Sequence, residues 1–176
     1  PITVSGDWKV TFCPQTKEKT FTQTFAGLVD FSKQKDNRIK YFSGTAVYET
    51  TFFASAQDIQ NGKRLIMDLG ELHDIAEVEI NGKEVAVLWL PPYRANISPF
   101  VKEGKNKLKV YVTNTWVNRL VGDEQYPADF EWTDKNQGLR AMIGLPEWLL
   151  KGKPRPIKER KTFLPWYYFN KNSPLL

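Results

Sequence analysis

Residues 76–89 constrain the fold more than any other part of the chain. Residues 76–80 alternate apolar and charged side chains, and Asn81-Gly82 follows them directly. This pair tolerates the two positive φ angles of a type I′ turn, so the segment predicts a tight β-hairpin. The return arm, residues 84–89, is almost continuously apolar after its glutamate, and we expect both of its faces to be covered.

The sequence after the hairpin predicts two more extended segments. Pro91-Pro92 cannot donate backbone hydrogen bonds, so the second hairpin strand has to end before this pair. Residues 93–97 are typical of a short extended segment, and residues 101–106 of a polar turn. Residues 107–112 then alternate lysine-type and apolar positions, which predicts a strand with Leu108, Val110 and Val112 facing the core.

The rest of the chain favours an all-β fold. Further β-rich stretches lie at residues 6–12, 20–25, 45–53 and 63–70, and a polar loop is expected at residues 30–40. Strands separated by turn signals, with 14% aromatic residues and little helical periodicity, predict an antiparallel β-sandwich. We expect a single domain, residues 1–176, with core strands at about 6–116. Residues 117–176 predict an irregular, aromatic tail that wraps a surface, with one short helix near residues 146–150.

The distribution of charge argues against a nucleic-acid partner. The chain carries a net charge of +5, and residues 151–161 hold six cations and one anion, which accounts for the whole excess. This proline-interrupted segment predicts a solvated basic connector and not a phosphate-binding face. No apolar run is long enough to cross a membrane, and no basic and apolar leader follows Pro1, although a leader removed by processing would leave the same start.

Single residues of reactive types predict little chemistry. Cys13 is the only cysteine, so it cannot form an internal disulfide, and its apolar surroundings favour a small structural side chain. His73 lies at a predicted turn without a histidine or cysteine partner and gives no metal constellation. The adjacent carboxylates of Asp123 and Glu124 raise the question of a glycosidase site, but sequence neighbours seldom flank a substrate, so solvated loop acids are favoured.

Several motifs resemble a known family. They are Ser43-Gly44-Thr45-Ala46-Val47-Tyr48, Asn81-Gly82-Lys83, Trp89-Leu90-Pro91-Pro92-Tyr93-Arg94, Gly104-Lys105-Asn106, residues 112–123, Lys158-Glu159-Arg160 and residues 172–176. Their order and spacing resemble the sugar-binding jelly roll of family 2 glycoside hydrolases. They are more closely similar to the C-terminal β-sandwich of bacterial α-L-rhamnosidase-like enzymes of family 106. In those relatives the tail continues into a final glycine-rich strand, so we expect this chain to be a fragment of a longer polypeptide.

The resemblance implies a galactose-binding-domain-like accessory module. In such enzymes the catalytic carboxylates lie on another domain, so no catalytic residue is expected in this chain, and the catalytic domain of the parent polypeptide is the expected partner. The resemblance also implies a bacterial, periplasmic or extracellular setting. No cofactor is required, although jelly rolls of this type often hold a structural calcium ion.

Seven residues are candidate carbohydrate ligands. They are Trp116, Asn118, Arg119, Asp123, Trp89, Tyr93 and Arg94. Trp116 to Asp123 form one group, which follows the end of a predicted strand, and Trp89 to Arg94 form the other. A loop after a strand can present an aromatic ring and well-directed hydrogen-bond donors to a sugar. The structural alternative is favoured for both groups: Trp116 covers the end of the core, Arg119 pins the tail, and residues 89–94 lock a proline corner.

Three functional hypotheses follow. The favoured one is a non-catalytic module that supports the catalytic domain of a glycoside hydrolase in polysaccharide degradation. The first alternative is an autonomous carbohydrate-binding module that captures an oligosaccharide. The second is a self-contained glycosidase that uses Asp123 or Glu124.

Overall fold

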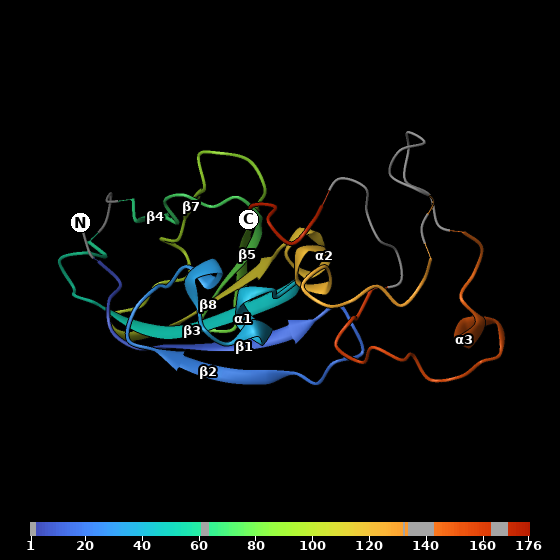
Figure 1. Ribbon diagram of the computed structural model, residues 1–176. Helices are drawn as coiled ribbons and strands as arrows, with labels where there is room; N and C mark the ends of the chain where they lie inside the picture. Colours follow the sequence, from blue (N-terminus) through green and yellow to red (C-terminus); the bar gives the residue numbers. More distant parts are fainter. Residues whose placement is uncertain (1–2, 61–63, 132, 134–142, 163–168) are drawn as a thin grey trace. The chain divides into compact units, whose positions relative to one another are not determined.

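The predicted hairpin is present in the computed structural model of the protein (Figure 1). It consists of β5 (Ile75–Ile80) and β6 (Lys83–Leu88), which pair antiparallel. Asn81 and Gly82 connect them with φ angles of 52° and 80°. Two positive φ angles are what a type I′ turn requires, so this prediction is confirmed.

The structure describes residues 3–60, 64–131, 133, 143–162 and 169–176. The chain divides into two compact units. Unit 1 comprises residues 1–31 and 43–115, and unit 2 comprises residues 32–42 and 116–176. That the whole chain forms one sandwich domain with a wrapping tail stays a prediction. Within the described part of the chain, no helix has the length and apolar character needed to cross a bilayer.

Unit 1 contains the eight strands found among the described residues. The remaining ones are β1 (Trp8–Pro14), β2 (Phe21–Phe25), β3 (Gly44–Ala54), β4 (Ile66–Asp68), β7 (Arg94–Asn96) and β8 (Gly104–Thr113). Six strands form one antiparallel sheet in the order β2-β1-β3-β8-β5-β6, while β4 pairs with β7. Figure 1 shows β4 and β7 above the larger sheet. The fold is the antiparallel β-sandwich that the sequence predicts.

The strand register gathers the core on one face of the large sheet. Val10 lies opposite Tyr48, which lies opposite Val110, and Val110 lies opposite Val78, so one row of apolar side chains crosses four strands. Because successive side chains of a strand point to opposite faces, the residues two positions away share this buried face. The most deeply buried large side chains of unit 1 are Phe12, Ile80, Val10, Val78 and Asn106.

A charged row crosses the opposite face of the same sheet. Glu49 on β3 forms ion pairs with Lys9 on β1 at 3.3 Å and with Lys109 on β8 at 3.2 Å. Partial burial acts to raise the pKa of Glu49, but the hydrogen bonds from the two lysines outweigh it and lower the pKa. The alternation of charged and apolar residues along these strands therefore reflects one solvent-exposed face and one buried face of the large sheet.

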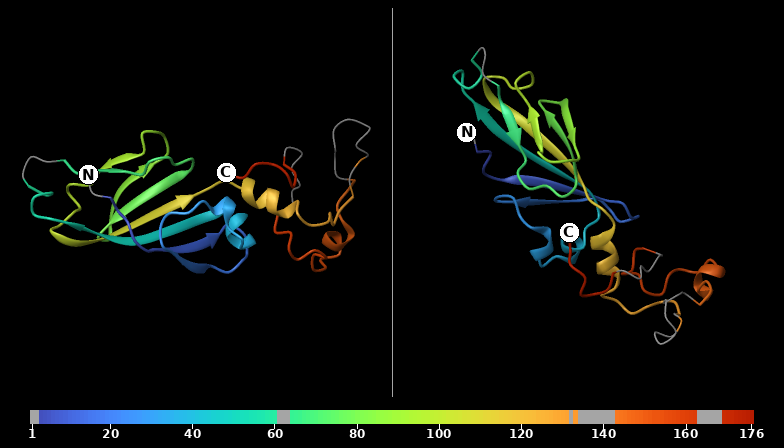
Figure 2. Two further views of the ribbon diagram at one scale, coloured as in Figure 1. Left: turned by 60° about the vertical axis from the view of Figure 1, so that its left-hand side comes forward. Right: turned by 90° about the horizontal axis from the view of Figure 1, so that it is seen from above.

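The return arm of the hairpin differs from the prediction. Among the described residues, β6 is the last strand of the large sheet, next to β5 (Figure 2). Val87 is 49% exposed, and Trp89, directly after the strand, is 65% exposed. The expectation that both faces are covered is wrong, because apolar content alone does not distinguish an interior strand from an edge strand with an open outer face.

The burial of Asn106 in unit 1 differs from what the sequence predicts. It lies in the segment predicted as a polar turn, yet it is fully buried in β8. Its Oδ1 accepts hydrogen bonds from Asn81 Nδ2 at 2.8 Å and Lys102 N at 2.9 Å, and its Nδ2 donates to Lys102 O and Gly104 O. Asn81 also accepts from Lys107 N through Oδ1 at 3.0 Å. The two asparagines therefore fix the hairpin turn against β8.

Unit 2 contains short helices that the sequence only partly predicts. They are α1 (Asn37–Lys40), α2 (Val117–Asp123) and α3 (Glu147–Leu150), and the 3₁₀ turn η1 (Phe31–Lys33) lies at the boundary of the units. Helix α3 confirms the prediction near residues 146–150. The polar loop expected at residues 30–40 instead contains α1, which Asp36 caps by accepting from Arg38 N at 2.9 Å.

We predict that Asn106→Ala destabilises the protein by about 2 kcal/mol, because it removes a fully buried amide whose hydrogen bonds hold Asn81 and the backbone of Lys102 and Gly104. Urea unfolding followed by circular dichroism measures this loss. Lys105→Ala, which changes an exposed neighbour on β8, is the matched control and should alter stability little. Equal stability of the two variants would contradict the role assigned to Asn106.

Candidate functional site

Helix α2 carries three of the seven predicted sugar-binding residues. Asn118, Arg119 and Asp123 are 4%, 8% and 2% exposed, respectively. The sequence predicts a loop here, and solvated acids at its end, and both expectations are wrong. The helix begins after Trp116 without a side-chain cap and contains Gly122, so it lacks the usual sequence signals of a helix.

The carboxylate of Asp123 is surrounded by donors from its own unit. Arg119, one turn earlier in α2, donates from Nε at 3.0 Å, and its second terminal nitrogen also lies 3.0 Å from Oδ1. Lys161 N donates at 2.9 Å, and Thr162 donates from both its backbone nitrogen and its hydroxyl at 2.6 Å. These contacts tie residues 161–162 to α2, and they occupy the oxygen atoms that a sugar hydroxyl would need.

Asn118 makes an equally complete set of contacts. Its Nδ2 donates to Leu176 O at 2.7 Å, and its Oδ1 accepts from Leu176 N at 2.8 Å. Both ends of the side-chain amide are thus paired with one backbone residue. This arrangement supports the structural alternative for residues 118–123, while a direct role in sugar binding stays a prediction.

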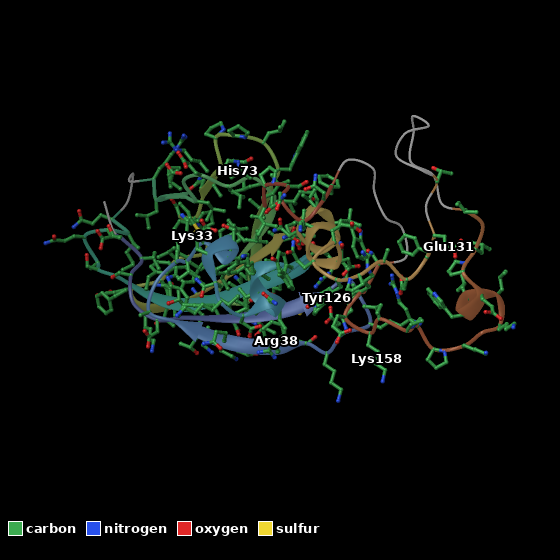
Figure 3. The ribbon with its side chains drawn as sticks, viewed as in Figure 1. Lys33, Arg38, His73, Tyr126, Glu131 and Lys158 are labelled. Carbon is green, nitrogen blue, oxygen red and sulfur yellow. The ribbon has the colours of Figure 1, made fainter. Side chains whose placement is uncertain are left out.

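The basic segment at residues 151–161 is not simply solvated. The side chain of Arg160 is 3% exposed and donates to Pro127 O at 2.8 Å, Tyr126 O at 3.0 Å and Glu124 Oε1 at 3.2 Å. Figure 3 labels Tyr126, which lies shortly after α2. Arg155 pairs with the buried Asp129, with one guanidinium nitrogen 3.0 Å from its carboxylate. The prediction of a solvated connector is therefore wrong for these two arginines.

The sequence gives no signal for these arginine contacts. Most of the groups that Arg160 binds are backbone carbonyls, which every residue carries, so no residue type marks them. The positive charges alternate with prolines and glycine, a pattern that by itself favours a linker. Only the folded path of unit 2 shows which cations are buried.

Gly122 allows close packing within unit 2. A Cβ atom at this position would lie 2.6 Å from Cβ of Tyr41 and 2.5 Å from a guanidinium nitrogen of Arg119. These distances are shorter than van der Waals contact. Glycine is therefore required here for Tyr41 to pack directly against α2 beside the Arg119–Asp123 pair.

The other motif positions in unit 1 also make structural contacts. Asn114, directly after β8, accepts from Gly44 N at 2.9 Å through its side chain, and its backbone nitrogen donates to Gly44 O. A Cβ on Gly44 would lie 2.3 Å from Cys13 O. The Ser-Gly and Asn-Thr-Trp motifs therefore join β3 to the end of β8.

The remaining candidates lie in two places. In unit 1, Arg94 Nε donates to Asp68 Oδ2 at 2.8 Å across the β4–β7 pair, and Trp89 and Tyr93 lie on the connection from β6 to β7. The pKa of the Asp68 carboxyl is lowered, first by the hydrogen bond from Gly70 N and second by Arg94. In unit 2, Trp116 is 42% exposed. The structure thus leaves the two tryptophans accessible and engages Arg94 in an exposed ion pair.

No metal centre forms among the described residues. Groups of three or more histidine, cysteine, aspartate or glutamate side chains able to hold an ion are absent from this part of the chain. His73, labelled in Figure 3, lies in an exposed position before β5. A structural calcium ion, which loop carbonyls could also hold, stays a prediction.

The comparisons with known proteins decide the family. Residues 23–146 match the family described as glycosyl hydrolase 2 galactose-binding domain-like. The chain belongs to this family. The chain is also 42% identical to a putative β-glucuronidase of Formosa agariphila. The match covers all 176 residues of this chain and 14% of the β-glucuronidase.

Solved structures agree with this assignment. A rhamnosidase from Novosphingobium sp. PP1Y is 38% identical with a TM-score of 0.66, over 73% of this chain and 12% of that one. A β-glucuronidase from Ruminococcus gnavus is 20% identical with a TM-score of 0.53, over 78% of this chain and 24% of that one. The second likeness shows the fold alone.

The chain is thus an accessory, non-catalytic domain of the galactose-binding-like type that glycosyl hydrolases contain. It spans 14% of the length of the curated relative and 12% of the similar rhamnosidase. The family match and these coverages confirm the galactose-binding-like family and the accessory role that the sequence predicts. The C-terminal position of the module in its parent stays a prediction.

We predict that Asp123→Ala destabilises the module by about 3–5 kcal/mol, because it leaves the buried Arg119 cation without its carboxylate. Denaturant unfolding measures the loss. Glu159→Ala removes an exposed acid from the same unit and serves as the control. An unfolding free energy for Asp123→Ala equal to that of the control would show that the carboxylate is not structural.

Asp74 generates a prediction on pH. Burial raises the pKa of this half-buried carboxyl, and the nearby His73 opposes the rise only in part. A raised folded-state pKa means that ionisation penalises the folded state as pH rises through that pKa, whereas below the unfolded-state pKa no penalty exists. Asp74→Asn should therefore stabilise the protein at pH 7 and lose this advantage near pH 3. Urea unfolding at both pH values tests this, and an advantage that persists at pH 3 would contradict it.

Proposed function

We propose that this galactose-binding-like module buttresses the catalytic domain of a larger, polysaccharide-degrading glycoside hydrolase within one polypeptide. The observation that carries the proposal is the complete internal pairing of the Asp123 carboxylate by Arg119, Lys161 and Thr162. Because Asp123 connects α2 to residues 161–162, this polar motif stabilises the module's own structure and favours a rigid surface. It offers few free donors and acceptors at that motif for a sugar.

The comparisons support the setting of this proposal. The putative β-glucuronidase and the rhamnosidase that the chain resembles are both several times longer than it, which leaves room for a separate catalytic domain. The parent reaction is hydrolysis of an O-glycosidic bond, with both catalytic carboxylates outside this chain. The same proposal includes a periplasmic or extracellular location in a bacterium, because a polysaccharide-degrading enzyme encounters its substrates there.

A second candidate is an autonomous carbohydrate-binding module. The exposure of Trp116 and Trp89, at 42% and 65%, favours it, because an accessible indole ring can stack on a sugar ring. The polar neighbours of Trp116 on α2 are, however, engaged with Leu176 and with residues 161–162. This reduces the number of hydrogen bonds that could orient a ligand beside that ring.

The proposal is tested by deleting the module from the parent polypeptide. We expect the truncated enzyme to show a lower thermal midpoint and faster inactivation, while the isolated module shows no turnover of an aryl glycoside. A truncated enzyme as stable and active as the intact one would overturn the buttressing role. Turnover by the module alone that is lost in Glu124→Ala, with the fold intact by circular dichroism, would instead support a self-contained glycosidase.

A further inference from the structure

An apolar patch lies at one edge of the large sheet in unit 1. We call it the β6 edge patch, and it consists of Ile75, Val87, Trp89 and Leu90, which are 48%, 49%, 65% and 59% exposed. Single exposed apolar residues are ordinary, but four of them on two paired strands and the residues that follow are not. The feature therefore needs an explanation beyond chance.

The strand register shows why these residues lie together. Ala76 on β5 lies opposite Leu88 on β6, and Glu77 lies opposite Val87. Ala76 is fully buried, so its neighbours Ile75 and Glu77, and with them Val87, belong to the outer face of the sheet. Trp89 follows Leu88 directly after the strand, so continuing the alternation places it on the face of Val87 and Ile75. Three residues of the patch thus share one face at the open end of the hairpin, and Leu90 follows them in the chain.

Carboxylates border this surface on one side. Glu79 lies opposite Glu84, two positions along β5 from Glu77 and past the register shift that follows Val78. Like charges at opposite positions destabilise a strand pair. Tyr111 donates to Glu79 at 3.0 Å, while Glu77 and Glu84 are exposed on the same hairpin. The hairpin therefore borders the apolar patch with the exposed carboxylates of Glu77 and Glu84, while Lys109 on β8 lies opposite Glu79.

The backbone of β6 adds a third property. Among the residues that the structure describes, β6 has β5 as its one neighbour in the large sheet, so the backbone groups on its other side form no ladder in that sheet. Soluble proteins usually protect such an edge with charges, prolines or a covering element. Lys83 and Glu84 protect the edge near the turn in this way, whereas its far end carries the exposed Val87 and then Trp89, which charges do not protect.

We propose that the β6 edge patch docks on the catalytic domain of the parent polypeptide, through a surface with an apolar centre and basic side chains facing Glu77 and Glu84. This inference rests on the proposed buttressing function and names the surface that performs it. The relatives of this chain extend far beyond the part that it covers, so a large folded partner is available in the same polypeptide.

The chemistry of the patch favours a protein partner over a glycan. Glycan recognition needs several directed hydrogen-bonding groups around an aromatic ring, whereas the exposed residues that register and chain order place near Trp89 are the aliphatic Ile75, Val87 and Leu90. Protein interfaces, in contrast, have a buried apolar and aromatic centre with a polar rim. A central tryptophan is also among the residues that contribute most to such interfaces.

Hydrogen exchange of the parent polypeptide, followed by mass spectrometry, tests the inference. We expect the β6 segment, residues 84–90, to exchange about tenfold or more slowly than β2, the edge strand at the other end of the same sheet. Trp89→Lys should remove this protection and lower the thermal midpoint. Phe53→Lys is the matched control, since Phe53 is 66% exposed on β3 of the same sheet, and it should leave both quantities unchanged.

The outcomes separate the inference from the proposed function. If deletion of the module destabilises the parent but residues 84–90 are unprotected, or Trp89→Lys behaves like Phe53→Lys, the docking surface is wrong and the buttressing role stands. If deletion has no effect, the proposed function itself fails. Protection that appears only after a rhamnose- or galactose-containing oligosaccharide is added would overturn the inference in favour of a glycan-binding face.

Discussion

A buried polar side chain must find its partners inside the protein, and this constraint organises both units of the chain. In unit 1 the fully buried Asn106 joins the hairpin turn at Asn81 to the start of β8. In unit 2 Asp123, 2% exposed, joins α2 to residues 161–162. Leaving either group unpaired would cost much of the marginal stability of a small domain, so the chain path around each is strongly determined.

The same constraint explains what the family motifs do. Gly44 and Asn114 connect β3 with the end of β8, and Asn81 and Asn106 fix the hairpin. Along α2, Arg119 pairs with Asp123. These motifs therefore carry the architecture of a galactose-binding-like module. Their presence identifies the galactose-binding-like module, and a role of these residues in sugar binding stays a prediction.

The hairpin and most strands could be predicted from the sequence, because alternation and the Asn-Gly turn are local signals. The burial of Asn106, Asp123 and Arg160 could not, because their partners are mainly backbone groups or residues distant in sequence. Helix α2 was missed since Trp116 and Gly122 mask its signals. The exposure of β6 was missed because strand order, which decides what covers a strand, depends on pairings far along the chain.

We infer that this module acts through protein contacts and internal scaffolding and not through a sugar site of its own. Calorimetric titration of the 176-residue chain with rhamnose- and galactose-containing oligosaccharides tests this inference. We expect no saturable heat of binding. Saturable binding that Trp116→Ala abolishes, with the fold shown intact by circular dichroism, would contradict it.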